Sequence, residues 1–112
     1  MRFRAKVVPA ITALLWITTA ACAADFTVEQ KNKTFMYNGA TAGTLKVKVG
    51  DLIQFKNADP YFHNVFSLSD AKLFDLGFYP QGQAKSVTFD KPGTFEVECA
   101  IHPQMKMTVE VK

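Results

Sequence analysis

The chain has 112 residues, of which 48% are hydrophobic, and carries a formal net charge of +3. This excess comes from Arg2, Arg4 and Lys6, so the rest of the chain has equal numbers of basic and acidic side chains. The composition therefore argues against a nucleic-acid or membrane-surface partner, and the length predicts one small domain.

The first 24 residues have the order of a secretory leader. The three basic residues are followed by an apolar stretch at residues 7–17, and then by small residues ending in Ala21-Cys22-Ala23. A basic head, an apolar segment and an Ala-x-Ala site are the three parts of a signal peptide. We predict cleavage after Ala23 or Ala24, leaving residues 25–112 as a periplasmic domain.

Two other interpretations of this segment are disfavoured by the residues it contains. Pro9 and Thr12 interrupt the apolar stretch, which is shorter than the ~20 residues of a membrane-spanning helix, so a retained anchor is not expected. Lipidation at Cys22 is also disfavoured, because Thr19 stands three positions before it, in place of a leucine-like residue. We therefore expect no membrane span in the mature chain.

The remainder of the chain is patterned as strands. Apolar and polar side chains alternate on both sides of turns at Gly50-Asp51 and Lys91-Pro92-Gly93. Short alternating segments separated by turn residues predict an all-β sandwich or barrel. The expected strands lie within residues 25–30, 33–38, 45–57, 63–68, 86–99 and 107–112. Residues 67–85 lack this alternation, and we expect a long connection there, with a short helical turn capped by Ser69 or Asp70 and reaching Phe74.

Near the end of the chain, the sequence CAIHPQM places Cys99, His102 and Met105 within seven positions. Cys99 is the only cysteine after the leader, so the mature chain cannot form an internal disulfide, and a lone thiol in a secreted protein needs a reason. The only other histidine, His63, opens the expected strand HNVFSL. Met107 is a second candidate sulfur donor, since strand parity alone does not separate it from Met105.

A thiolate, two imidazoles and a weak thioether form the ligand set of an electron-transfer copper site. Zinc favours four firm tetrahedral ligands, and calcium or magnesium requires oxygen ligands that this cluster lacks. Each residue taken singly has an ordinary explanation, such as a buried cysteine, a turn histidine or a methionine filling the core. Their combination predicts one copper ion, Cu(I) or Cu(II), as the cofactor.

With these residues, the chain resembles the cupredoxins, the blue copper proteins that include plastocyanin, pseudoazurin and amicyanin. The resemblance rests on LKVKVGDLIQFKN, similar to the family's paired strands around a Val-Gly-Asp turn, on DPYFHNVF, and on FEVECAIHPQMKMTVEVK, where Pro103 follows the second histidine as in amicyanin. It implies a Greek-key β-sandwich and the copper ligands His63, Cys99, His102 and Met105. Met105 is preferred over Met107 because the family's axial methionine precedes the first inward valine of the last strand by four residues.

The resemblance has further implications for the surroundings of the copper. It implies that Asn64 braces the Cys99 loop by hydrogen bonds. It also implies an exposed apolar docking patch, formed by Pro60, Phe62, Ile101, His102 and Pro103. The strand before Cys99 differs from the aromatic-rich strand of plastocyanin, since Glu96 and Glu98 flank Val97, so electron routes along that strand do not transfer.

Three functions could use these residues. The favoured one is a non-enzymatic, monomeric carrier that passes single electrons between redox protein partners. A copper-buffering or resistance protein would use the same four ligands, but the mature chain offers only Met36 and Met107 as spare sulfur donors and no spare histidine. An enzyme with a Cys-His nucleophile pair is disfavoured, because Cys99 and His102 share one tight turn without an evident orienting residue.

Overall fold

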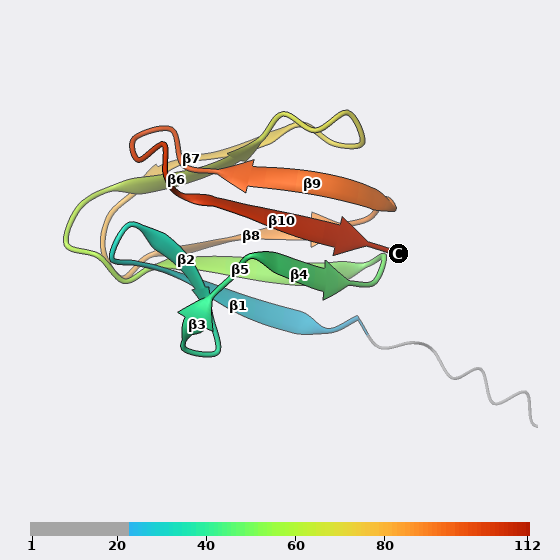
Figure 1. Cartoon of the computed structure of the whole chain (residues 1–112), viewed down its shortest axis with the longest axis horizontal. Helices are drawn as coiled ribbons and strands as arrows, with labels where there is room; N and C mark the ends of the chain where they lie inside the picture. The colour runs from blue at the N-terminus through green and yellow to red at the C-terminus, as the bar shows by residue number, and fades with distance from the viewer. Residues whose placement is uncertain (1–22) are drawn as a thin grey trace, which may run out of the picture.

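Two five-stranded β-sheets pack face to face in the computed structural model, which describes residues 23–112 (Figure 1). The predicted leader at residues 1–24, with Cys22, lies outside this range except for Ala23 and Ala24. The strands are β1 (Asp25–Lys31), β2 (Thr34–Tyr37), β3 (Ala40–Thr41), β4 (Thr44–Val47), β5 (Asp51–Asn57), β6 (His63–Ser67), β7 (Phe74–Tyr79), β8 (Ala84–Phe89), β9 (Gly93–Glu98) and β10 (Lys106–Val111).

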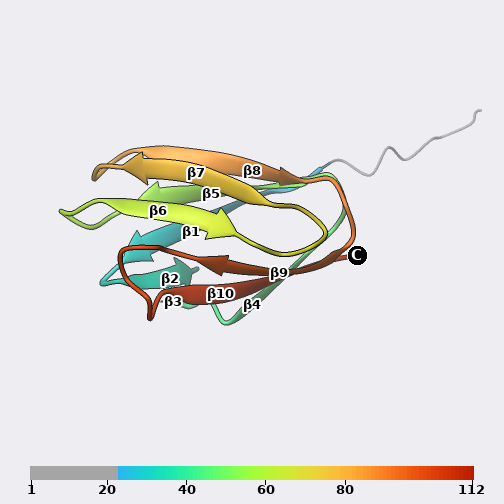
Figure 2. The same cartoon turned by 90° about the horizontal axis from the view of Figure 1, so that it is seen from above.

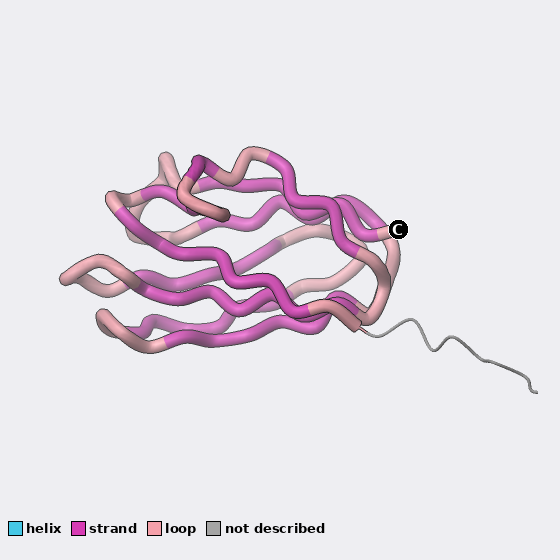
Figure 3. The backbone as a smooth tube through the Cα atoms, turned by 90° about the horizontal axis from the view of Figure 1, so that it is seen from below, coloured by secondary structure: helices cyan, strands magenta, loops and turns pink. Residues whose placement is uncertain are grey.

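One sheet has the strand order β3-β2-β1-β5-β8, and the other has the order β4-β10-β9-β6-β7. The pairs β1–β5 and β4–β10 are parallel, and the other neighbours are antiparallel. Figure 3 shows strands joined by loops, with no helix in the described residues, and no candidate membrane-spanning helix was found among them. The predicted all-β sandwich is confirmed.

The expectation of paired strands around the Val-Gly-Asp turn is wrong. β4 and β5 lie in different sheets, and so do β8 and β9 across the second predicted turn. The turns are therefore links between the two layers, not hairpins. Strand alternation predicts which side chains face inward, but it does not predict which sheet a strand joins.

The layers are held together by the apolar face of each sheet. Phe89 of β8 and Phe95 of β9 meet across the two sheets with ring centroids 5.2 Å apart, and Phe35 and Phe55, within one sheet, meet edge to face at 6.0 Å. Such tilted aromatic contacts add to the free energy gained by burying the rings. The aliphatic side chains of the core, such as Val109, come from the inward positions of the strands.

The prediction of a long connection over residues 67–85 is wrong, because part of this segment is a strand. Phe74–Tyr79 form β7, an edge strand paired with β6, and the turn before it, at Asp70, continues into no helix. The pairing has an irregularity between Asn64 and Phe66, and Gly77 has a φ of +72°. This combination shifts the inward–outward alternation by one residue, so Leu76 packs against the core but Phe78, two positions later, is exposed and Tyr79 is buried instead. The period-two signal was therefore absent from the sequence.

Several connections meet at one end of the sandwich. The loop from β9 to β10, the loop from β5 to β6 and the turn from β1 to β2 all lie there, at the left of Figure 2. The backbone N–H groups of Asn32 and Lys33, in the β1–β2 turn, both donate to Asp59 in the β5–β6 loop, at 2.7 and 3.1 Å. This end of the molecule is therefore built from tightly bonded loops that come from both sheets.

Candidate metal centre

At this end, two imidazoles and one thiol converge from segments far apart in the sequence. His63 is the first residue of β6, Cys99 follows the last residue of β9, and His102 lies in the loop to β10. The Cys99 sulfur is 3.7 Å from Nδ1 of His63 and 3.8 Å from Nδ1 of His102, and the two Nδ1 atoms are 3.2 Å apart. The fold thus joins three of the four donors that the sequence predicted.

These separations suit a single metal ion. Two donors that are each about 2.1 Å from a metal ion at a tetrahedral angle lie about 3.4 Å from one another, and a sulfur donor lies slightly further out. The separations of 3.2, 3.7 and 3.8 Å between the three donor atoms match that spacing without rearrangement. A preformed group of this kind is what a metal site on a rigid scaffold requires.

The group is shielded from water on most sides. His63 and Cys99 are buried, and His102 is half-buried. The Tyr61 ring packs against both imidazoles, with its centroid 5.3 Å from that of His63 and 5.2 Å from that of His102. Burial lowers the pKa of His102, and the nearby His63 and Lys33 add to this effect. The imidazole of His102 is therefore favoured in the neutral form, which is the form that binds a metal ion.

Hydrogen bonds fix the loop that carries Cys99 and His102. The Cys99 N–H donates to the carbonyl of Met105 at 3.3 Å, and the Met105 N–H donates to the carbonyl of His102 at 2.9 Å. Asn64, next to the first histidine, accepts the Ala100 N–H on Oδ1 at 2.6 Å. The loop bracing expected for Asn64 is confirmed.

The two methionines differ in where they stand on the β9–β10 ladder. Met107 lies opposite Val97, whereas the bond from the Cys99 N–H to the Met105 carbonyl sets Met105 opposite Cys99. Both side chains are buried. Because a strand advances about 3.3 Å per residue, Met107 is about 6.6 Å further from the donor group along β10. The backbone therefore favours Met105 as the methionine beside the site.

Sequence reasoning missed the partner of the first histidine. Nε2 of His63 is 2.7 Å from Oδ2 of Asp59, four residues earlier in the chain, and both side chains are buried. Burial alone would raise the pKa of Asp59, but the hydrogen bonds from His63, Lys33 and Asn32 outweigh it, and the pKa lies below its ordinary value. A carboxylate four positions before a ligand histidine was visible in DPYFH, but nothing in the sequence required the two side chains to meet.

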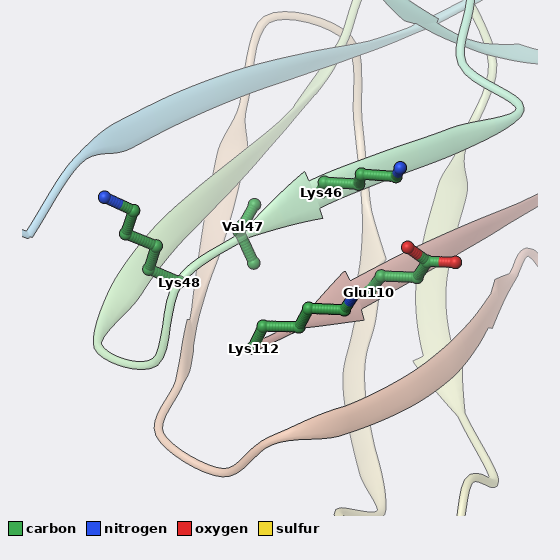
Figure 4. A pocket seen from close by; sticks show the side chains of 5 residues that line it. All are labelled: Lys46, Val47, Lys48, Glu110 and Lys112. Atoms are coloured by element: carbon green, nitrogen blue, oxygen red, sulfur yellow. The ribbon is translucent and has the colours of Figure 1, made fainter.

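A surface pocket of about 190 Å³ lies at the other end of the sandwich (Figure 4). It is lined by Val47, Glu110 and the lysines Lys46, Lys48 and Lys112. The three lysines are exposed and Glu110 is half-buried, and they come from β4, β10 and the residues that follow these strands.

Comparisons with known proteins agree with this geometry. Residues 23–112 match the family described as copper binding proteins, plastocyanin/azurin family. The methylamine utilization protein MauL of Methylorubrum extorquens is 34% identical over 68 residues, which cover 60% of this chain and 60% of MauL. The chain therefore spans less than two thirds of that relative.

Solved structures give the same result for the fold. A Cu(I) form of an amicyanin mutant has a TM-score of 0.68 and 26% identity, over 79% of this chain and 82% of that one. The oxidised state of another amicyanin mutant has a TM-score of 0.67 and 28% identity, over 85% and 87% of the two chains. A copper-containing nitrite reductase from Thermus scotoductus, 24% identical with a TM-score of 0.68, matches 79% of this chain with only 22% of its own, and shows the fold alone. The predicted cupredoxin resemblance and copper cofactor are confirmed: the chain belongs to the plastocyanin/azurin family of copper-binding proteins.

Proposed function

We propose that this protein carries single electrons between redox partners in the periplasm, through one copper ion held by His63, Cys99, His102 and Met105. The observation that supports this most is the convergence of Cys99 Sγ and the Nδ1 atoms of His63 and His102, at 3.2–3.8 Å from one another, in a hydrogen-bonded setting where two of the three residues are buried. Copper bound to such a set supplies a one-electron couple between Cu(I) and Cu(II).

The protein residues contribute rigidity to this function. His63 is held by a strand and by Asp59, Cys99 by its bond to Met105, and the intervening loop by Asn64. Donors that keep their positions in both oxidation states need little rearrangement when an electron enters or leaves. With Met105 as the fourth donor, no position is left for a substrate, which favours a carrier over an enzyme.

The surface near His102 suits brief contact with a redox partner. Tyr61, Phe62 and Ile101 are exposed large hydrophobic residues, and His102 is half-buried among them. Pro60 and Pro103, also exposed, complete the patch that the family resemblance implied. A small apolar face with few charges gives a weak, short-lived complex, as electron exchange requires. We propose that electrons pass through His102 at this patch, with the protein acting as a monomer.

The absorption spectrum of the copper-loaded mature protein tests the copper ligands. Cu(II) bound to the Cys99 thiolate gives an intense visible charge-transfer band, and Cys99→Ser removes it while the fold is retained. A Cys99→Ser protein that keeps the colour would rule out the assignment. Carrier and buffer are separated by the rate of electron self-exchange, which is fast only for a carrier, and by whether copper excess alone induces the protein.

We also propose that the leader is removed after Ala23. Ala24 is bound into the sandwich, because its N–H donates to Oδ1 of Asp51 at 2.8 Å and its carbonyl accepts the Leu52 N–H at 3.0 Å. Cleavage after Ala23 keeps this contact and gives it the charge of an α-amino group. The intact mass of the protein from a periplasmic extract distinguishes a chain that begins at Ala24 from one that begins at Asp25.

A further inference from the structure

The hydrogen bond between His63 and Asp59 is enclosed within the protein. The His63 side chain is 0% exposed and the Asp59 side chain 5% exposed, and Nε2 lies 2.7 Å from Oδ2. A buried carboxylate is costly to desolvate, so its position beside a metal-binding histidine calls for an explanation. The bond is neither a surface ion pair nor part of the strand ladders.

The carboxylate is fixed in place by the backbone around it. Oδ1 accepts the Asn32 N–H at 2.7 Å, and Oδ2 accepts the Lys33 N–H at 3.1 Å as well as the bond from His63. The Asp59 N–H in turn donates to Oδ1 of Asn57 at 2.8 Å. Asp59 is thus held between the β1–β2 turn and the end of β5, and its orientation does not depend on His63.

This arrangement decides which nitrogen of His63 carries the proton. An ionised carboxylate only accepts hydrogen bonds, so Nε2 must donate to it, and the neutral ring then keeps its lone pair on Nδ1. Nδ1 is the atom that faces Cys99 Sγ and Nδ1 of His102, at 3.7 and 3.2 Å. The carboxylate therefore prepares the imidazole for a metal ion before one arrives.

We propose that Asp59 is a positioning residue that holds His63 as the Nε2–H tautomer, and that its buried negative charge stabilises Cu(II) relative to Cu(I). The proposal rests on His63 as a ligand in the proposed function. The Cys99 thiolate and the Asp59 carboxylate together carry two negative charges. These neutralise the two positive charges of Cu(II), whereas with Cu(I) one negative charge remains unbalanced. Carboxylates that hydrogen-bond to a ligand histidine commonly change metal affinity by about 10–100-fold.

The test compares Asp59→Asn with a matched control, Asp51→Asn. Asp51 is also buried and accepts two backbone N–H groups, from Ala24 and Lys48, both at 2.8 Å. It opens β5, whereas Asp59 follows the end of that strand, so the two sites are about 20 Å apart at the usual rise per residue. Both variants lose a buried carboxylate, but only one loses it beside His63.

We expect Asp59→Asn to weaken Cu(II) binding about tenfold more than Cu(I) binding, which raises the midpoint potential by about 59 mV for one electron. Asp51→Asn is expected to keep the wild-type potential. A wild-type potential in Asp59→Asn, or an equal rise in both variants, would overturn the proposal. If the copper-loaded wild-type protein shows no visible band, the assignment of the copper ligands is wrong, and the role of Asp59 fails with it for that separate reason.

A second measurement needs no variant and no copper. Long-range proton–nitrogen NMR couplings of the copper-free wild-type protein at about pH 9 identify the protonated nitrogen of each histidine. We expect His63 to carry its proton on Nε2, with slow exchange of that proton with water because the site is buried. A His63 ring protonated on Nδ1 would contradict the proposed role of Asp59, even if Asp59→Asn did not fold.

Discussion

Replacing Asn64 by alanine tests how strongly the metal-ligand loop depends on one side chain. Asn64 is buried on β6, and its Oδ1 accepts the Ala100 N–H at 2.6 Å across 36 positions of sequence. Leaving a buried donor unpaired costs about 1–3 kcal/mol. Because Ala100 itself is exposed, water can partly replace the lost acceptor. We therefore expect Asn64→Ala to lower the free energy of unfolding by about 1–2 kcal/mol.

We expect the same substitution to weaken copper binding, which bears more directly on function than the loss of stability. Ala100 directly follows Cys99, so removing its acceptor frees the loop that presents the thiolate and His102. Loss of such a supporting bond typically costs about 10–100-fold in metal affinity. We expect copper to dissociate at least about tenfold faster from Asn64→Ala, measured by transfer of Cu(I) to a chelator.

Ser67→Ala is the matched control, because Ser67 is buried at the other end of β6 and its hydroxyl donates to Oγ of Ser69 at 3.0 Å. Urea unfolding of the copper-free proteins should show a loss of stability in both variants, whereas only Asn64→Ala should release copper faster. A wild-type release rate in Asn64→Ala, or an equal increase in Ser67→Ala, would refute the reasoning that Asn64 braces the loop.

Two further outcomes follow from the same geometry. Met105→Leu is expected to change the visible spectrum and the potential, whereas Met107→Leu should leave both unchanged, because Met107 lies opposite Val97, about 6.6 Å further along β10. Each replacement should lower the free energy of unfolding in urea by less than about 1.5 kcal/mol. A spectral change in Met107→Leu alone would reverse the assignment of the axial methionine. Backbone N–H donors lower the pKa of Asp51, so its carboxylate stabilises the fold above the unfolded-state pKa of about 3.9, and this contribution is lost as the pH falls through the lower folded-state value. Unfolding of the copper-free protein should therefore depend less on pH in this acid range in Asp51→Asn, and an unchanged pH profile would contradict that role.

Residues close together in the chain were predicted well. The alternation in residues 107–112 and on both sides of Gly50-Asp51 identified strands, because a half-buried strand places every second side chain in the core. The spacing of Cys99, His102 and Met105 predicted metal donors from one short loop, and the structure places two of them, Cys99 and His102, together with His63. Both inferences needed only the periodicity of a strand and the preferences of a metal ion.

Distant contacts had a different origin. β7 was missed because the irregular pairing near Asn64 and the positive φ of Gly77 remove the alternation that marks a strand. The order of strands in the two sheets, the approach of His63 to Cys99, and the bonds that fix Asp59 to the β1–β2 turn arise only when segments far apart in the chain come together. Their energies come from burial and from hydrogen bonds between segments tens of residues apart, and no local pattern of residues specifies which segments will meet.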